Sequence, residues 1–167
     1  MNQMPFVRRL LLGLFAVLLL EVMTAAPVFA NSPVRQKLDF PPTGTFSGLC
    51  TFDVDYAIVV NTEYTITWFD SANHPIRGLT QGRLVVSFTN ASNPANHMTL
   101  NISGPGKTTF NADGSQTIVF LGNSLVFTAD DMVLSSGRLV VVAPDPLSPG
   151  VIVSASGNQR SLCEMLG

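Results

Sequence analysis

The sequence predicts an all-β protein, folded as an antiparallel up-and-down β-barrel of about eight or nine strands, with a two-sheet β-sandwich as the alternative. Three observations support this fold class. Apolar and polar residues alternate in many short segments, and 13 Gly and 11 Pro are spread along the chain. No segment of the mature chain has the apolar period of a helix.

Residues 1–30 have the features of a secretory signal peptide. Arg8 and Arg9 form a positive start, and an apolar run of 11 residues follows. That run is too short to span a hydrocarbon core of about 30 Å as a helix. We therefore predict export and secretion, with a cut after Ala30. The alternatives are a cut after Ala26 and an uncleaved N-terminal anchor.

The composition excludes several classes of protein. Charged residues make up 12% of the chain and apolar residues 46%, so disorder driven by charge is excluded. Lys and Arg total 9 against 11 Asp and Glu, and no basic run follows the signal, so we expect no nucleic-acid partner. We expect no membrane span once the signal is removed, because no second apolar run is long enough.

The mature chain divides into an irregular lead segment, residues 31–48, and a single β domain, residues 49–167. Proline and glycine interrupt the lead segment. The first strand of the domain is indicated by period-two alternation, with apolar residues at Cys50, Phe52, Val54, Tyr56, Ile58 and Val60. The same pattern continues through Tyr64, Ile66 and Trp68. Asn61 and Thr62, between the two segments, indicate a hairpin turn.

Further strands are expected at residues 77–89, 98–103, 107–110, 116–121, 124–128, 139–143 and 151–154. Within the first of these, Gly78 and Gly82 indicate a bend or bulge rather than the end of the strand. Asp113 and Gly114 form the strongest hairpin signal of the chain. Helix is expected only as a short turn near Glu164 or in the lead segment.

Cys50 and Cys163 are the two cysteines of the chain. An exported protein meets an oxidising compartment, so a disulfide is predicted. One alternative is two free thiols. Another is a pair of metal ligands, although two cysteines without a nearby His form a poor zinc site. A disulfide holds its Cα atoms within about 7 Å. The first and last strand-like segments should then be neighbours, as a closed barrel would make them.

A resemblance to known proteins is carried by six short segments and by their order along the chain. They are residues 50–54, 82–84, 88–90, 99–106, 113–115 and 162–166. Together with the two end cysteines, they resemble short exported all-β proteins of bacteria, common in actinobacteria, that have no assigned activity. The resemblance spans most of residues 49–166. It implies a small secreted β domain and no catalytic residues.

No motif for catalysis or metal binding is complete. Residues 104–109 end like a phosphate-binding loop, but the first Gly of that motif is missing and a hairpin replaces its helix. Residues 111–115 begin like a calcium loop that lacks the later Glu. His74 and His97 have no nucleophile elbow to accompany them. We predict no catalytic residues, no metal site and no cofactor.

Three aromatic residues, Tyr56, Tyr64 and Trp68, share one strand face by parity. If that face points inward, they line either the core or a ligand cup. They are our predicted ligand-lining residues. The leading hypothesis is a secreted, non-enzymatic β domain that binds a small apolar molecule or an extracellular partner.

Two alternatives are an extracellular structural protein, which predicts a filled interior, and a barrel-mouth enzyme such as an isomerase or cyclase. The enzyme would need buried polar groups. Inward-pointing Asp53, Asp55, Glu63, Arg83 or a histidine would favour it.

Overall fold

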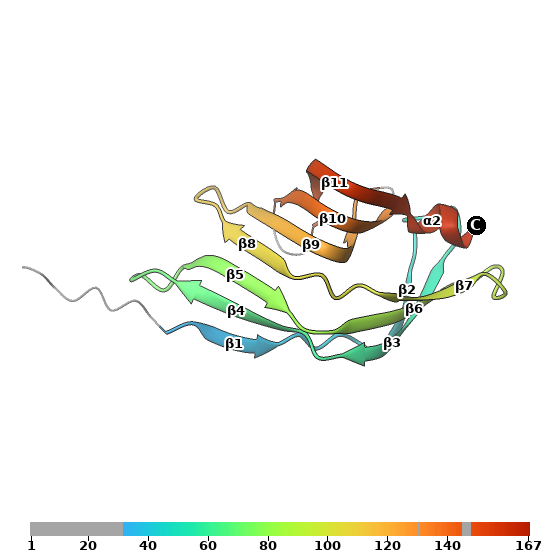
Figure 1. Ribbon diagram of the computed structural model, residues 1–167, viewed down its shortest axis with the longest axis horizontal. Helices are drawn as coiled ribbons and strands as arrows, with labels where there is room; N and C mark the ends of the chain where they lie inside the picture. The colour runs from blue at the N-terminus through green and yellow to red at the C-terminus, as the bar shows by residue number, and fades with distance from the viewer. Residues whose placement is uncertain (1–31, 130, 145–147) are drawn as a thin grey trace, which may run out of the picture. The chain divides into compact units, whose positions relative to one another are not determined.

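The structure is a computed structural model that describes residues 32–129, 131–144 and 148–167 (Figure 1). All of these residues belong to the unit Asn31–Gly167. The predicted signal peptide, residues 1–30, and its cut after Ala30 lie outside the described residues. The all-β prediction is confirmed, because the described residues form 11 strands in two antiparallel sheets, followed by one short helix.

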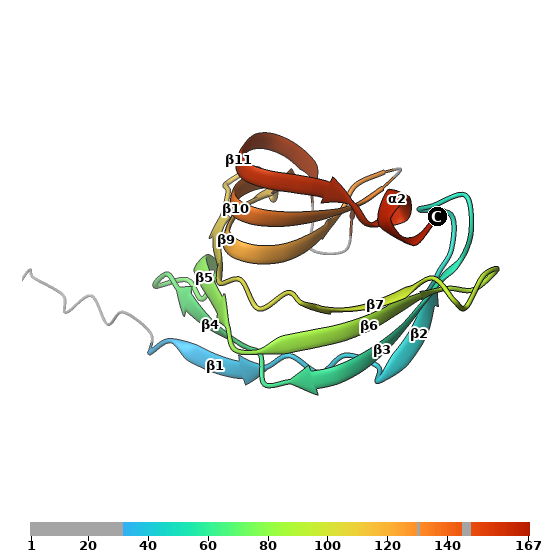
Figure 2. The same cartoon turned by 45° about the vertical axis from the view of Figure 1, so that its right-hand side comes forward.

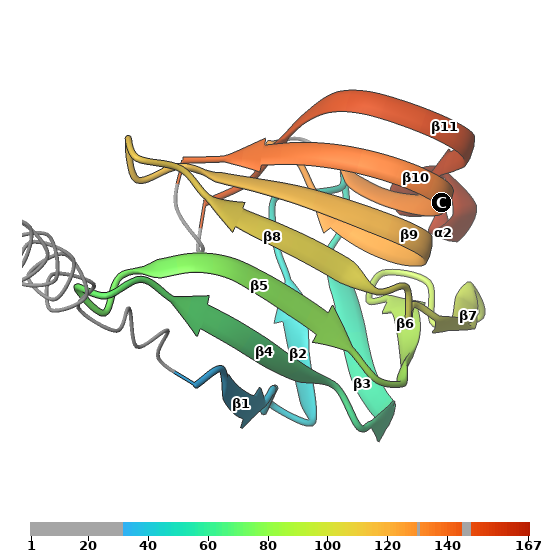
Figure 3. The ribbon, with the colours of Figure 1, turned by 60° about the vertical axis from the view of Figure 1, so that its left-hand side comes forward.

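The seven-stranded sheet contains, in spatial order, β1 (Val34–Lys37), β4 (Tyr64–Phe69), β5 (Pro75–Gln81), β8 (Gly106–Phe110), β9 (Gln116–Phe127), β10 (Met132–Ala143) and β11 (Val151–Ser161). The four-stranded sheet contains β2 (Thr43–Phe46), β3 (Val54–Asn61), β6 (Leu84–Asn90) and β7 (His97–Asn101). The helix, α2 (Leu162–Leu166), follows β11 directly. Figure 3 shows β1, β4, β5, β8 and β9 side by side.

The chain passes from one sheet into the other four times, from β1 to β2, β3 to β4, β5 to β6 and β7 to β8. Each crossing joins two strands into one long run, and the four runs have the same order in both sheets. The connectivity is therefore an up-and-down meander of long antiparallel runs, of which the first four bend between the sheets.

The predicted hairpin at Asn61 and Thr62 is wrong, because β3 and β4 do not pair. This segment is instead the link by which the chain changes sheets, and the Thr62 N–H donates to the Arg83 carbonyl at 2.8 Å. The neighbouring link, from β5 to β6, bends at Gly82 with φ +134°. The predicted bend at Gly82 is thus the third sheet crossing, and residues 77–89 form two strands in different sheets rather than one bent strand.

The predicted barrel is also wrong, since the described residues form no closed barrel and contain more than eight or nine strands. In the described part of the chain, β11 pairs with β10, and the strands at the other end of the meander pair with β4 and β3. Closure would need a hydrogen-bonded ladder between the first and last runs. The result is the sandwich-like alternative, in which β9–β11 lie over the four-stranded sheet (Figure 2).

A row of glycines bends the β9–β11 part of the sheet. Gly122, Gly137 and Gly157 are in register on the three strands, with φ of 76°, 153° and 94°. A Cβ at Gly137 would lie 2.2 Å from the Ser156 carbonyl oxygen, so only glycine fits there. The curvature of these strands is visible in Figure 2.

The predicted disulfide is confirmed. Cys50 lies in the link between β2 and β3, Cys163 lies in α2, and their Cα atoms are 5.4 Å apart. The bond therefore fastens the C-terminal helix to the other end of the meander without a strand ladder. The expected helical turn near Glu164 is confirmed as α2, which Ser161 caps by accepting from the Glu164 N–H at 3.1 Å.

The main core joins both sheets and the helix. Its buried members are Val54, Val86, Phe88, Met132, Leu162 and Leu166. Residues 31–48 differ from the irregular structure expected of them, because they contain β1 and β2. No helix in the described residues is long and apolar enough to cross a membrane.

Candidate functional site

A cavity of about 420 Å³ lies between the two sheets, a size typical of small-molecule sites. Alternation on β3 and β6 builds one wall. Tyr56 pairs with Phe88 and Ile58 with Val86, and all four side chains line the cavity. Because these residues are apolar or aromatic, this wall offers a ligand mainly apolar surface.

Small residues on β5 and β8 of the opposite wall leave the space open. In the seven-stranded sheet, Thr80, Gly106 and Phe120 are in register across β5, β8 and β9, and all three line the cavity. A Cβ at Gly106 would lie 3.4 Å from the Phe120 ring. The ring therefore covers the glycine, and a larger residue there would displace it.

Three of the four links between the sheets also contribute to the cavity wall. They provide Phe40, Glu63 and Ile102. Phe40 is 43% exposed, so the cavity reaches the surface of the domain at the link between β1 and β2. The cavity lies where the bent runs separate into two sheets.

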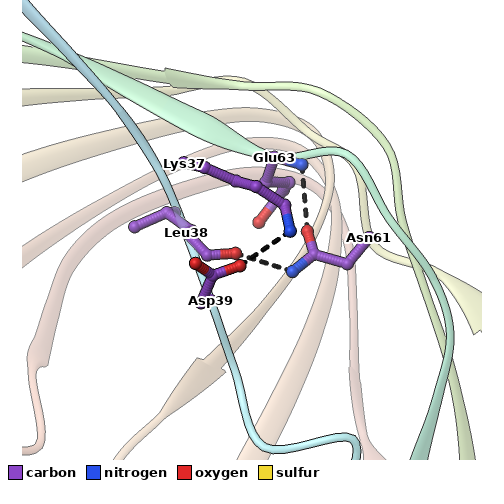
Figure 4. Close-up of polar contacts among 5 residues, drawn as sticks. All are labelled: Lys37, Leu38, Asp39, Asn61 and Glu63. Atoms are coloured by element: carbon purple, nitrogen blue, oxygen red, sulfur yellow. Dashed lines mark hydrogen bonds and ion pairs between the residues drawn. The ribbon is translucent and has the colours of Figure 1, made fainter.

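Two polar side chains of the cavity wall are buried without partners. Glu63 is 6% exposed and Ser124 is 3% exposed. The Ser124 Oγ has no hydrogen-bond partner within the described residues. Burial is the resolved influence on the Glu63 carboxyl, and no hydrogen bond or ion pair joins that carboxyl to the other residues drawn in Figure 4. Buried polar groups are nearly always paired, so these two groups mark the polar part of a candidate ligand site.

The backbone of Glu63 is fixed on both sides (Figure 4). Its N–H donates to Asn61 Oδ1 at 2.9 Å, and its carbonyl accepts from the Leu38 N–H at 3.0 Å. The Asn61 side chain in turn donates to the Leu38 carbonyl at 2.7 Å. These bonds hold the backbone, and they leave the carboxyl free to face the cavity.

Gly82 completes this arrangement from the neighbouring link. A Cβ at Gly82 would lie 2.5 Å from the Glu63 Cα, so the two backbones touch. Lys37, the cation drawn in Figure 4, pairs with Asp39 at 2.7 Å on the surface. Burial therefore acts on Glu63 without compensation and raises the pKa of its carboxyl.

The three aromatic residues singled out from the sequence lie in different places. Tyr56 lines the cavity and stacks on Phe46, with ring centroids 4.8 Å apart. Tyr64 and Trp68 are on β4 in the other sheet and do not line the cavity. The guanidinium carbon of Arg35 lies 3.7 Å from the ring centroid of Tyr64, and that of Arg77 lies 4.0 Å from the ring centroid of Trp68.

A β-bulge in β3 explains why the alternation that places Tyr56 in the cavity does not place Tyr64 and Trp68 there. The register with β6 shifts between Ile58 and Val60, and one extra residue turns every later side chain to the other face. On β4, Thr65 pairs with Thr80, which lines the cavity. By alternation, Tyr64 belongs to the opposite face of that sheet.

The other charged candidates named from the sequence are exposed: Asp53, Asp55, Arg83, His74 and His97. Glu63 is thus the one member of that group that is buried. In the described residues, no group of three or more His, Cys, Asp and Glu side chains could hold a metal ion.

Ser124 was missed by the sequence reasoning, and Glu63 was considered only as one of several charged residues. The available signal for Glu63 was its position at the break in alternation between two apolar segments. Ser124 gave no signal, because an isolated serine in a strand is ordinary.

Fold and site together define an all-β, disulfide-linked domain with a mainly apolar cavity between two antiparallel sheets. Comparison of the chain with protein-family models, curated proteins and solved structures finds no match. The resemblance to exported bacterial β proteins stays a prediction.

Proposed function

We propose that this protein is an exported, non-enzymatic binding protein that holds a small apolar ligand between its two sheets. The observation that carries the proposal is the cavity of about 420 Å³, whose wall is mainly apolar and contains the buried Glu63 and the unpartnered hydroxyl of Ser124. Apolar surface removed from water contributes about 25 cal/mol per Å², so an enclosed hydrocarbon ligand would be held mainly by burial.

Export is supported by two independent features. The N-terminal sequence has the order of charged start, apolar run and small residues that secretory signals share. The disulfide between Cys50 and Cys163 is the kind of bond that persists outside the reducing cytoplasm.

The test compares two tryptophan substitutions at neighbouring positions of β3. Ile58 lines the cavity, whereas Val59 is 58% exposed. Ile58→Trp fills the cavity, and Val59→Trp adds the same side chain to the surface. We would titrate each protein with the neutral fluorescent probe N-phenyl-1-naphthylamine. Native mass spectrometry of the purified protein would show any ligand that is retained.

Wild type and Val59→Trp should bind the probe with similar affinity, and Ile58→Trp should bind it at least about tenfold more weakly, since about 1.4 kcal/mol of lost contact gives that factor. Equal affinity in all three proteins would show that the probe does not occupy the cavity. No binding of the probe to wild type, together with no retained ligand, would reject the proposal.

The buried Glu63 favours one second candidate, an enzyme of isomerase or cyclase type. A buried carboxyl with a raised pKa is suited to general acid–base catalysis. The two functions separate when a ligand recovered from the protein is incubated with wild type and with Glu63→Gln. Conversion by wild type alone would support the enzyme, and unchanged ligand in both would support the binding protein.

A further inference from the structure

The cavity wall has an acidic side chain, and no basic side chain among the described residues accompanies it. Glu63 is the single carboxylic acid of the wall, and no Lys, Arg or His lines it within the described residues. An anionic ligand would therefore find no positive partner and would meet a like charge. A cationic ligand would find its partner in Glu63.

Three cations of neighbouring strands are engaged elsewhere, and Arg83 and Lys107 are exposed. Lys37 pairs with Asp39 at 2.7 Å. Arg35 and Arg77 lie over Tyr64 and Trp68. Glu63 therefore has no counter-charge from these residues, although it is only 6% exposed. A buried charge without a partner is strongly unfavourable, and a ligand cation would remove that penalty.

The wall also suits a cation because it is rich in aromatic rings. Six of its side chains are aromatic: Phe40, Phe46, Tyr56, Phe88, Phe120 and Phe127. The faces of aromatic rings carry negative electrostatic potential and attract ammonium groups. The Ser124 hydroxyl, which has no partner in the described residues, can accept a hydrogen bond from such a group.

We propose that the ligand is an apolar amine, with one protonated nitrogen that pairs with the Glu63 carboxylate and a hydrocarbon or aromatic body that fills the cavity. This inference rests on the proposed function and adds the chemical class of the ligand. The ammonium donates a hydrogen bond to the Glu63 carboxylate, and Ser124 remains an acceptor for a second polar group of the ligand. The rest of the wall encloses the apolar body.

Three probes with the same ten-carbon chain separate the possibilities: decylamine, decanol and decanoate. Each would be titrated at pH 7, below its aggregation concentration, into the purified disulfide-linked protein and followed by calorimetry. Decylamine should bind at least about tenfold tighter than decanol, because hydrogen bonds to charged groups exceed neutral ones by roughly that factor. Decanoate should bind most weakly.

Glu63→Gln tests the assigned partner, and Glu164→Gln is its matched control. Glu164 is exposed on α2 and does not line the cavity. Glu63→Gln should bring the affinities for decylamine and decanol within about threefold of each other, since the charge-assisted term is lost. Glu164→Gln should leave the wild-type ratio unchanged.

The outcomes separate this inference from the proposed function. Decanol binding as tightly as decylamine in wild type would overturn the amine and leave a cavity that binds apolar molecules. A preference for decylamine that survives Glu63→Gln would also overturn it. If none of the three probes binds, the amine proposal fails, and the proposed function is decided by the N-phenyl-1-naphthylamine titration and native mass spectrometry. The wild-type ranking decides the question even if Glu63→Gln does not fold.

Discussion

Removing the disulfide should destabilise the protein without changing its fold. The perturbation is the double substitution Cys50→Ser and Cys163→Ser. The bond joins residues with a sequence separation of 113, and the chain-entropy relation then gives about 16 cal/mol/K, or about 4.8 kcal/mol at 25 °C. We expect a measured loss of about 2 to 5 kcal/mol, because native disulfides of small secreted domains fall in that range.

The helix that carries Cys163 has other anchors. Leu162 and Leu166 are fully buried. Asn90 donates to the Leu166 carbonyl at 3.1 Å, and Asn96 donates to the Gly167 carbonyl at 2.8 Å. Because these contacts do not depend on the sulfur bond, α2 should stay docked in the variant. The lost stability then reflects mainly the less restricted unfolded chain.

The assay is urea unfolding, followed by the fluorescence of Trp68 and by far-UV circular dichroism, with and without a reductant. Wild type should lose stability when reduced, and the double variant should be insensitive to the reductant. A loss of less than about 1 kcal/mol, well under the expected range, would refute the reasoning. A changed dichroism spectrum for the folded variant would show that α2 and its neighbours need the bond.

Three further substitutions test the bend, the core and the buried carboxyl. Gly137→Ala should lower the free energy of unfolding in urea by about 2 kcal/mol or more, because φ is 153° and the Cβ would lie 2.2 Å from a carbonyl oxygen. Its control is Gly48→Ala, where φ is 78° and the Cβ would lie in open space, so the loss should be about half as large. Phe88→Ala, at a site that is 1% exposed, should cost about 3 to 5 kcal/mol in the same assay. Burial raises the folded pKa of Glu63 above its ordinary value of 4.5, so wild-type stability should fall relative to Glu63→Gln as pH rises from 4.5 through that raised pKa. A pH-independent difference between these two proteins would contradict the last prediction.

The strands that face the core were predictable from alternation alone. On β6, the apolar positions Leu84, Val86 and Phe88 fall on one parity, and all three pack into the core or against it. The disulfide was predictable because two cysteines, in a chain whose N-terminal sequence predicts export, allow one pairing. Both inferences use rules that need no knowledge of distant partners.

The sheet crossings could not be read from local pattern. Asn61 and Thr62 suit a hairpin, and the same polar residues suit a link that changes sheets. Residues far away in the sequence decide between the two structures. The Thr62 N–H donates to the Arg83 carbonyl, and the Asn61 side chain donates to the Leu38 carbonyl. The prediction of a closed barrel failed for a related reason. A single disulfide brings the two ends of the domain together without requiring their strands to pair.

The crossings that the sequence did not reveal are also what creates the site. A strand that continues within one sheet places each residue in a ladder, with side-chain neighbours on both sides. Glu63 lies instead in a link between sheets, where hydrogen bonds from its neighbours occupy its backbone and none of the neighbours drawn in Figure 4 reaches its carboxyl. Phe40 and Ile102 enter the cavity wall from equivalent links. An unclosed meander with bent runs therefore yields an apolar space edged by link residues. That is why a buried acid can occur there without a counter-charge from the chain.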